Sequence, residues 1–356
     1  KAGAKRSIVV TGFGSDMVRS AVRTRAEFVL QEEQLGTGHA VRMTESLFYP
    51  ASGNKESIRE TIMVLCGDTP LLTAETLSLL AAEHEKSGAK ATVLTAKLAD
   101  PKGYGRIIRD SSGAVEKIVE EKDADQEERK VQEVNSGIYC FEVETLFATL
   151  KEVKNDNAQG EYYLPDVLSI LKQKKEKIWA TAVGDAGEII GINSRRQLAS
   201  AEKIMRQRKL EELMDSGVTI MDPDSTFIDA EVEIGADTII YPFTWIEGQT
   251  VIGKNCELGP SLRLQNMTIG DGVTGQFTYA HDATVDDGVI LGQFVHVRPN
   301  SHLAKNVKIG NFVEVKNSEI GEGTKLPHLS YIGDSDIGAG VNMGCGTITV
   351  NYGSGS

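Results

Sequence analysis

The sequence is poor in features that define several classes of protein. Only 9 of its 356 residues are proline, and aromatic residues make up 6%. Its four cysteines, Cys66, Cys140, Cys256 and Cys345, lie far apart, with no CxxC pair and no histidine at the spacing of a zinc site. This pattern excludes a disulfide framework and a structural zinc motif. It is typical of free thiols in a reducing compartment, so we expect a cytoplasmic protein.

Positive charge and long apolar segments are also scarce. Lys and Arg number 38 against 51 Asp and Glu, which gives a net charge of −13. Nucleic acids and anionic membranes attract clustered positive charge, so neither is an expected partner. No stretch approaches the roughly 18–20 apolar residues of a membrane span, and the first six residues lack the apolar core of a signal peptide.

Glycine, in contrast, is abundant, with 36 residues in the chain. A chain of this length suggests two domains at roughly 150 residues per domain. The first part alternates short apolar runs, at residues 7–10, 61–66 and 91–96, with a helical pattern at 73–86 that opens on Thr73 as an N-cap. This alternation predicts an α/β domain with a mainly parallel sheet.

Residues 194–216 contain neither glycine nor proline within the helical pattern and predict a connecting helix. Its basic residues are typical of a solvated helix face rather than of a phosphate site. Beyond Gly217 the texture changes, because aliphatic residues recur at steps of six with one step of five: Val285, Leu291, Val297, Leu303, Ile309, Val315, Ile320, Leu326 and Ile332. Many are followed by glycine, as at Gly292, Gly310 and Gly321.

A period of six predicts a solenoid of short strands with the aliphatic side chains inside. We expect the glycines to serve tight turns. Residues 274–279 disturb the repeat and predict an irregular turn.

Three motifs carry a specific resemblance: EQLGTGHA at 33–40, NAQGEYYL at 157–164 and HLSYIGD at 328–334. Together with the hexads they resemble the bacterial bifunctional N-acetylglucosamine-1-phosphate uridyltransferase / glucosamine-1-phosphate N-acetyltransferase over nearly the whole chain. The resemblance implies a nucleotidyltransferase domain with a Rossmann-like mixed sheet at residues 1–193 and a linker helix at 194–216. A left-handed parallel β-helix of hexapeptide repeats then follows at 217–352, and the chain is expected to form homotrimers.

The resemblance also implies the reactions and the small molecules that take part. Acetyl-CoA acetylates glucosamine-1-phosphate, and UTP then reacts with N-acetylglucosamine-1-phosphate to give UDP-N-acetylglucosamine and pyrophosphate. Mg²⁺ is the implied cofactor of the second reaction.

The chain departs from the family pattern at both ends. Family members open with a strand and a glycine-rich phosphate loop followed by a lysine, and nothing similar precedes Lys1. They continue through further coils where this chain ends in Gly-Ser-Gly-Ser at 353–356, which is expected to be a linker tail. We therefore expect a chain truncated at both ends, with very weak uridyltransferase activity or none.

Asp68 is the first candidate metal ligand, because it follows an apolar strand and Gly67 at an edge where α/β sheets bind ligands. Taken alone, it is equally a turn residue. The resemblance implies Asn193 as the second ligand, although an asparagine there also suits a helix cap. It further implies nucleotide contacts by Gln31, Gly36 and Thr37.

The N-acetylglucosamine moiety is implied to contact Gly105, Glu120 and Asn135, and UDP-N-acetylglucosamine to contact Asn193 as well. By composition Glu120 lies in a charged run that would ordinarily be a solvated face.

Attack of an amine on a thioester needs a base near neutral pH, for which histidine is suited. Of six histidines, the resemblance implies His328 as this base, with Glu314 orienting it. It implies Arg298 and Lys316 as ligands of the sugar phosphate. These two are 18 residues apart, which places them on adjacent coils of one face. Without the family they are equally two surface cations.

Further contacts follow from the resemblance alone. Tyr331 and Asn342 match sugar contacts, although Asn342 also suits a turn. Cys345, Asn351 and Tyr352 match the acetyl-CoA site, with a small core residue as the simpler interpretation of Cys345.

Two other functions stay open. One is a single-function sugar-phosphate nucleotidyltransferase whose β-helix is structural or regulatory, against which His328, Arg298 and Lys316 argue together. The other is a catalytically inert trimeric scaffold.

Overall fold

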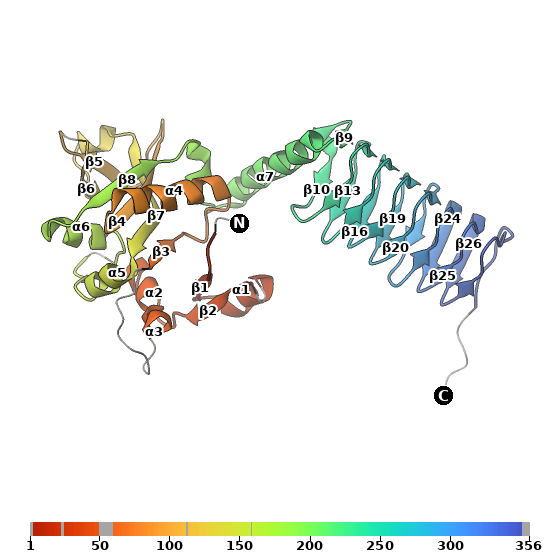
Figure 1. Cartoon of the computed structure of the whole chain (residues 1–356), viewed down its shortest axis with the longest axis horizontal. Coiled ribbons are helices and arrows are strands. Elements are labelled where there is room, and N and C mark those ends of the chain that lie inside the picture. The colour runs from red at the N-terminus through yellow and green to blue at the C-terminus, as the bar shows by residue number, and fades with distance from the viewer. Residues whose placement is uncertain (1–2, 23–24, 50–59, 112, 158, 351–356) are drawn as a thin grey trace. The chain divides into compact units, whose positions relative to one another are not determined.

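The computed structural model describes residues 3–22, 25–49, 60–111, 113–157 and 159–350. The chain forms two compact units, Lys1–Gln197 and Leu198–Ser356. The first unit contains helices and a mixed sheet, and the second contains one long helix and a stack of short strands (Figure 1).

The elements of the first unit follow from the sequence patterns. Its α-helices are α1 (Ser15–Val22), α2 (Thr37–Arg42), α3 (Glu45–Phe48), α4 (Ala74–Ser87), α5 (Val143–Leu150) and α6 (Asp166–Gln173), with short 3-10 helices η2 (Glu128–Lys130) and η3 (Ala186–Ile189). Its strands are β1 (Ile8–Thr11), β2 (Glu27–Leu30), β3 (Thr61–Val64), β4 (Ala91–Lys97), β5 (Arg106–Arg109), β6 (Val115–Val119), β7 (Glu133–Glu142) and β8 (Ile178–Ala182). The predicted strands and the helix at 73–86 are confirmed to within a few residues.

The sheet of this unit is mixed, with the order β6-β5-β7-β4-β8 and with β3 also paired to β7. Strand β7 runs antiparallel to β3, β4 and β5, and only β4 and β8 pair in parallel within this sheet. The prediction of a mainly parallel sheet is therefore wrong. The reason is that β7, which comes later in the chain, lies between β3 and β4. Strands β1 and β2 form a separate parallel pair.

The core of the first unit lies on both faces of β4 and β7. Val93 and Tyr139 pack on one face with residues of α5 and α6, and Leu94 and Ile138 pack on the other with Leu80 of α4. Six consecutive residues of β4 are buried, as expected of a strand covered on both sides.

Helix α4 has the predicted cap. The side chain of Thr73 accepts a hydrogen bond from the backbone N–H of Thr76, which satisfies one of the unpaired donors at the helix start.

The second unit begins with the predicted helix, α7 (Arg195–Asp215). Its strands are β9 (Thr219–Ile220), β10 (Phe227–Ile228), β11 (Glu233–Ile234), β12 (Ile239–Ile240), β13 (Trp245–Glu247), β14 (Val251–Ile252), β15 (Glu257–Leu258), β16 (Arg263–Gln265), β17 (Thr268–Ile269), β18 (Thr274–Gly275), β19 (Tyr279–His281), β20 (Thr284–Val285), β21 (Ile290–Leu291), β22 (His296–Val297), β23 (His302–Leu303), β24 (Lys308–Lys316), β25 (Glu319–Ile320), β26 (Lys325–Gly333) and β27 (Asp336–Ile337). A 3-10 turn, η4 (Pro223–Ser225), lies before β10.

These strands stack as the coils of a left-handed parallel β-helix, so the predicted fold class is confirmed (Figure 1). Arg263 pairs with Tyr279, Tyr279 with His296 and His296 with Glu314, so a coil has 16, 17 or 18 residues. The hexad aliphatics from Val285 to Ile332 are all buried in one continuous core. At residues 274–279 the ladder continues through β18 and β19, and Gly275 and Ala280 take interior positions. The irregularity predicted there is a shorter coil.

The glycines that follow the aliphatics serve a different purpose from the one expected. Most residues with positive φ in the second unit are Asn, Asp or Phe, whereas Gly310 and Gly321 do not have positive φ. Instead, a Cβ on Gly310 would overlap the carbonyl oxygen of Pro327 on the next coil, and one on Gly321 would lie 2.6 Å from the carbonyl carbon of Gly338. These glycines allow adjacent coils to approach closely.

Gly310→Ala should therefore destabilise the β-helix. The added methyl group must displace backbone of the next coil, and overpacking of this kind typically costs about 1–3 kcal/mol. Gly338→Ala is the matched control, because a Cβ at that position meets nothing within 4 Å. In thermal unfolding monitored by circular dichroism, we expect a lower Tm for Gly310→Ala only. Equal Tm values for the two variants would contradict the close-approach explanation.

A second prediction concerns His302, which links three coils. Its Nε2 lies 3.1 Å from Oδ2 of Asp286 and its Nδ1 lies 2.8 Å from Oε2 of Glu319. Burial lowers the pKa of His302, but the hydrogen bonds to Glu319 and Asp286 outweigh it and raise the pKa above the ordinary value. The resulting stabilisation is complete below the unfolded-state pKa of about 6.5 and is lost as the pH rises through the higher folded-state pKa.

The free energy of unfolding should thus fall as the pH rises from about 6 through the folded-state pKa. His302→Gln should flatten this part of the profile in denaturant titrations at a series of pH values. A variant profile parallel to that of the wild type would show that the His302 cluster does not contribute.

Candidate active sites

Two of the family motifs lie against each other in the first unit. The N–H of Tyr162 donates to the carbonyl of Leu35 and the N–H of Gly38 donates to the carbonyl of Tyr162, both at 2.8 Å. Gly36 has a φ of 101°, and a Cβ there would lie 2.7 Å from the carbonyl oxygen of Tyr162. This close approach, together with the positive φ, requires glycine.

The two polar residues predicted for the nucleotide lie at the same point. Gln31 is buried, its Nε2 donates to the carbonyl of Gly36 at 3.1 Å, and the same atom lies 2.9 Å from Nδ1 of His39. The hydroxyl of Thr37 accepts the N–H of Leu164 at 3.0 Å. The structure thus brings Gln31, Gly36 and Thr37 together and holds their side chains through backbone groups.

The residues predicted for the sugar also converge. The N–H of Asn135 donates to the carbonyl of Gly105 at 2.8 Å, and a Cβ on Gly105 would lie 3.2 Å from Oε1 of Glu120. The amide of Asn135 is buried and exchanges hydrogen bonds with the hydroxyl of Tyr139. The result is a small polar group of a carboxylate, an amide and a bare backbone segment.

The electrostatics of this group favour a shielded carboxyl. Desolvation of the Glu120 carboxyl group, with repulsion from Asp123 and Asp166, raises its pKa above the ordinary value. The residue as a whole is exposed, so the charged run is partly a solvated face, but its carboxyl end points toward Gly105.

Asp68 and Asn193 are brought together by Gly191. A Cβ on Gly191 would lie 2.9 Å from Oδ2 of Asp68 and 3.7 Å from Nδ2 of Asn193. The N–H of Ile192 donates to the carbonyl of Asp68 at 2.9 Å, so the two loops are also joined through their backbones. The carboxylate and the amide thus share one exposed space that only glycine leaves open.

The alternative role of Asn193 as a helix cap falls to its neighbour. The hydroxyl of Ser194 accepts the N–H of Gln197, and the Gln197 side chain accepts hydrogen bonds from Asn193 N–H and from the Ser194 hydroxyl. This reciprocal arrangement is a capping box at the start of α7.

The residues around Gly191 suit a hard cation such as Mg²⁺. Among the described residues, no group of three or more His, Cys, Asp or Glu side chains is arranged to hold a metal ion. Mg²⁺ does not need such a cage, since it is commonly bound by one or two carboxylates together with water and substrate phosphates. One carboxylate and one amide oxygen at a space cleared by glycine fit this pattern.

In the second unit, coil stacking brings the two predicted cations together. His296 pairs with Glu314 and Val297 with Val315, and the N–H of Arg298 donates to the carbonyl of Val315. Arg298 and Lys316 therefore occupy equivalent positions on adjacent coils, as the spacing of 18 predicts. Arg298 contacts the carboxylate of Glu314 at 2.8 Å, and Lys316 contacts that of Asp334 at 3.3 Å.

Glu314 is connected to Arg298 rather than to His328. On the next coil, Glu314 pairs with Tyr331, whereas His328 pairs with Asn311. The expectation that Glu314 orients His328 is not supported by this register. Asn311, which sequence reasoning missed, is the neighbour of the exposed His328 across the coils. The 17-residue spacing between them could have identified it.

The remaining candidates lie at the last described coils. The Tyr331 ring folds over Gly333, where a Cβ would overlap its hydroxyl group. Asn342 forms a backbone bridge with Lys325. Cys345 is exposed, so its interpretation as a small core residue is wrong, because the aliphatic interior does not extend to its position. Asn351 and Tyr352 lie outside the described residues.

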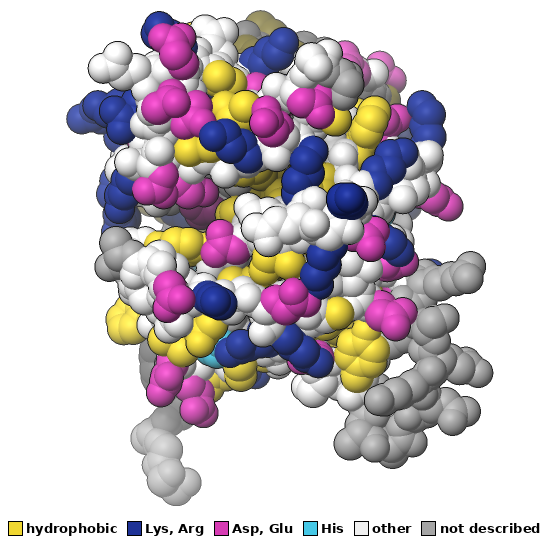
Figure 2. Space-filling view, turned by 90° about the vertical axis from the view of Figure 1, so that its left-hand side faces the viewer, with side chains coloured by type: hydrophobic (Ala, Val, Ile, Leu, Met, Phe, Trp, Pro, Cys, Tyr) yellow, Lys and Arg dark blue, Asp and Glu magenta, His cyan; other side chains and the backbone are white. Residues whose placement is uncertain are grey.

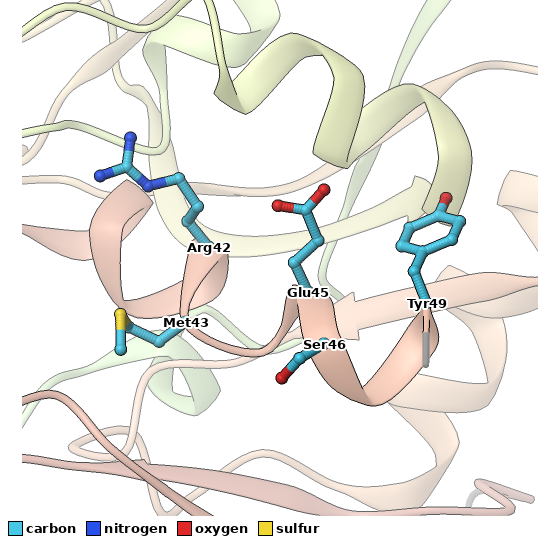
Figure 3. A pocket seen from close by; sticks show the side chains of 5 residues that line it. All are labelled: Arg42, Met43, Glu45, Ser46 and Tyr49. Carbon is cyan, nitrogen blue, oxygen red and sulfur yellow. The ribbon is translucent and has the colours of Figure 1, made fainter. Parts of the chain in front are cut away.

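A pocket elsewhere in the first unit contains none of the predicted residues. It has a volume of about 410 Å³ and is lined by Arg42, Met43, Glu45, Ser46 and Tyr49. Arg42, Glu45 and Tyr49 project to one side of α2 and α3, and Met43 and Ser46 project to the other (Figure 3). Arg42 stacks on Tyr162 and Glu45 pairs with Lys151. Since the side chains do not converge, the pocket offers no arrangement for catalysis.

The described helices and the surface add two findings. None of these helices is both long and apolar enough to cross a membrane. On the face of the molecule in Figure 2, acidic and basic side chains are interspersed, without a broad area of positive charge.

Comparisons with known proteins identify the family. The model of the nucleotidyl transferase family matches residues 1–187. The "Bifunctional protein GlmU" of Geobacillus sp. (strain WCH70) is 49% identical over 350 residues, which are 98% of this chain and 75% of that protein. Those of Halalkalibacterium halodurans and Heliobacterium modesticaldum are both 51% identical, over 97% and 98% of this chain and 74% and 75% of theirs.

Identity at this level along nearly the whole chain agrees with the resemblance carried by the three motifs and the hexads. The chain therefore belongs to the GlmU family of bifunctional uridyltransferase and acetyltransferase enzymes, and its first unit is a nucleotidyl transferase domain.

Proposed function

We propose that the chain contributes both active sites of UDP-N-acetylglucosamine synthesis, one in each unit. The observation that carries the proposal is the coil register of the second unit. It places Arg298 and Lys316 side by side, with Tyr331 and His328 on the coil that follows. A β-helix that only supported a nucleotidyltransferase would have no need of this group of residues on one face.

The acetyl transfer site is proposed on the residues around Arg298. The Arg298 guanidinium and the Lys316 ammonium bind the phosphate of glucosamine-1-phosphate, since a planar guanidinium and a compact ammonium are suited to a phosphate. Glu314 holds the guanidinium in place. His328 accepts a proton from the amine, whose nitrogen forms a bond to the acetyl carbon as the bond to sulfur breaks and coenzyme A leaves as the thiol.

The remaining acetyl-site candidates belong to the same proposal. Tyr331 and Asn342 contact the sugar, and Cys345, Asn351 and Tyr352 contribute to the acetyl-CoA site. Cys345 is exposed and so is accessible to a ligand.

The uridylyl transfer site is proposed in the first unit. Gln31, Gly36 and Thr37 bind the nucleotide, and Gly105, Glu120 and Asn135 bind the N-acetylglucosamine moiety. Asp68 and Asn193 would hold Mg²⁺, which neutralises phosphate charge when bound. Nucleotidyl transfer depends mainly on positioning and on charge neutralisation, so the protein groups orient the sugar phosphate for attack on UTP.

We further propose that the chain assembles as a homotrimer in the cytoplasm. An exposed apolar stripe supports the assembly: Phe277, Phe294 and Phe312 stack along one corner of the β-helix, with ring centroids 5.7 and 5.1 Å apart. Contiguous exposed apolar surface of this kind commonly marks a protein contact. The four free cysteines agree with a reducing compartment.

The acetyl transfer proposal is tested by His328→Ala. Release of coenzyme A thiol from acetyl-CoA and glucosamine-1-phosphate should fall at least about 100-fold, the lower end of the contribution of a general base. Asp68→Asn, in the other unit, is the control and should leave thiol release unchanged. Thiol release that persists in His328→Ala would overturn the assignment of the base.

The metal site is tested by Gly191→Ala. The new Cβ would crowd Oδ2 of Asp68, the mobile end of an exposed side chain, so the carboxylate must move while the fold is retained. We expect Mn²⁺ binding in the presence of UDP-N-acetylglucosamine, measured by water proton relaxation, to weaken about tenfold. Gly184→Ala, where a Cβ meets nothing within 4 Å, is the control. Unchanged Mn²⁺ affinity in Gly191→Ala would contradict the site.

A further inference from the structure

We propose that Glu188 is a positioning residue that sets the distance between the segments carrying Asp68 and Asn193. The inference rests on the proposed metal role of those two residues. Glu188 lies in η3 and is 6% exposed, an unusual degree of burial for a carboxylate. Its burial is explained by the hydrogen bonds that it accepts.

Both carboxylate oxygens of Glu188 are engaged at the first turn of α4. Oε2 accepts hydrogen bonds from the backbone N–H of Thr73 at 2.9 Å and from its hydroxyl at 3.1 Å. Oε1 accepts the hydroxyl of Thr76 at 3.1 Å. Because both oxygens are directed at α4, we assign Glu188 a positioning role rather than metal binding.

The start of α4 is a favourable partner for a carboxylate. The first N–H groups of a helix have no partner within the helix, and the helix dipole places partial positive charge there. Thr73 already caps Thr76 with its hydroxyl oxygen, so Glu188 adds an acceptor for the Thr73 N–H that the cap does not satisfy. This carboxylate comes from a residue 115 positions away in the sequence.

The contact between Glu188 and α4 lies close to both metal candidates along the chain. Thr73 is five residues after Asp68, and Glu188 is five residues before Asn193. A second link, from Ile192 N–H to the carbonyl of Asp68, joins the same two segments. The segments are thus joined at two points, and the close approach of Gly191 to Asp68 falls beside the second.

This arrangement predicts how loss of Glu188 would act. Without the carboxylate, the Thr73 N–H and two threonine hydroxyls lose their acceptor, and the segment containing residues 189–193 is joined to the Asp68 loop at only one point. The Asp68 carboxylate and the Asn193 amide then no longer have a fixed separation, which lowers their joint affinity for a cation.

The test measures Mn²⁺ affinity in the presence of UDP-N-acetylglucosamine by water proton relaxation. Glu188→Ala should weaken binding about tenfold, the lower end of the effect of residues that orient metal ligands. Glu188→Gln should bind within about twofold of the wild type, since its amide oxygen can accept from Thr73 and its amide nitrogen can donate to the Thr76 hydroxyl. Glu75→Ala, an exposed residue in the same turn of α4, is the control and should have no effect.

Two further variants separate the possible failures. Asp68→Asn tests the metal site itself, and unchanged Mn²⁺ affinity in this variant would refute the proposed metal role. A loss in Asp68→Asn without a loss in Glu188→Ala would refute the positioning role alone. An equal loss in Glu188→Gln and Glu188→Ala would also refute it, because hydrogen-bond geometry is retained in the first.

Thr76→Val covers the case in which Glu188→Ala does not fold. It removes a single hydrogen bond to Glu188 with little change of shape, and we expect a loss of Mn²⁺ affinity of about threefold with the fold retained. Hydrogen exchange of the Ile192 amide should accelerate in the same variant. If affinity and exchange both match the wild type, the positioning role is wrong.

Discussion

Backbone pairing between successive coils is the constraint on which the second unit depends. Each strand is fixed to the next at a register of 16 to 18 residues, so an outward side chain recurs at the same place on the next coil. Glycines such as Gly310 permit the close approach that this pairing needs. The same register, without any further device, places Arg298 next to Lys316 and Glu314 next to Tyr331.

The first unit obtains its candidate site by a related principle. Segments far apart in the sequence meet through backbone groups, as Gly38 does with Tyr162 and as Ile192 does with Asp68. Glycine stands at the contact in both cases, and the polar side chains lie around it. Glu188 adds a side-chain link at the second contact, so the separation of Asp68 and Asn193 depends on groups outside the site.

Much of the fold could be predicted from the sequence, because its signals are local. The buried hexads, the Thr73 cap of α4 and the adjacency of Arg298 and Lys316 all follow from spacing or from neighbouring residues. Features that depend on partners distant in the sequence could not be predicted. The insertion of β7 between β3 and β4, the reason for Gly310, the exposure of Cys345 and the pairing of Glu314 with Arg298 all depend on which segments meet in space.

The central claim is that coil register creates a sugar-phosphate site in the β-helix. The most direct measurement is a titration of glucosamine-1-phosphate with the protein, followed by its ³¹P resonance. The account predicts a saturable shift that is lost in both Arg298→Ala and Lys316→Ala. It should be kept in Arg263→Ala, an arginine of the β-helix that is paired with Glu247. A saturable shift that survives in Arg298→Ala and Lys316→Ala would contradict the account.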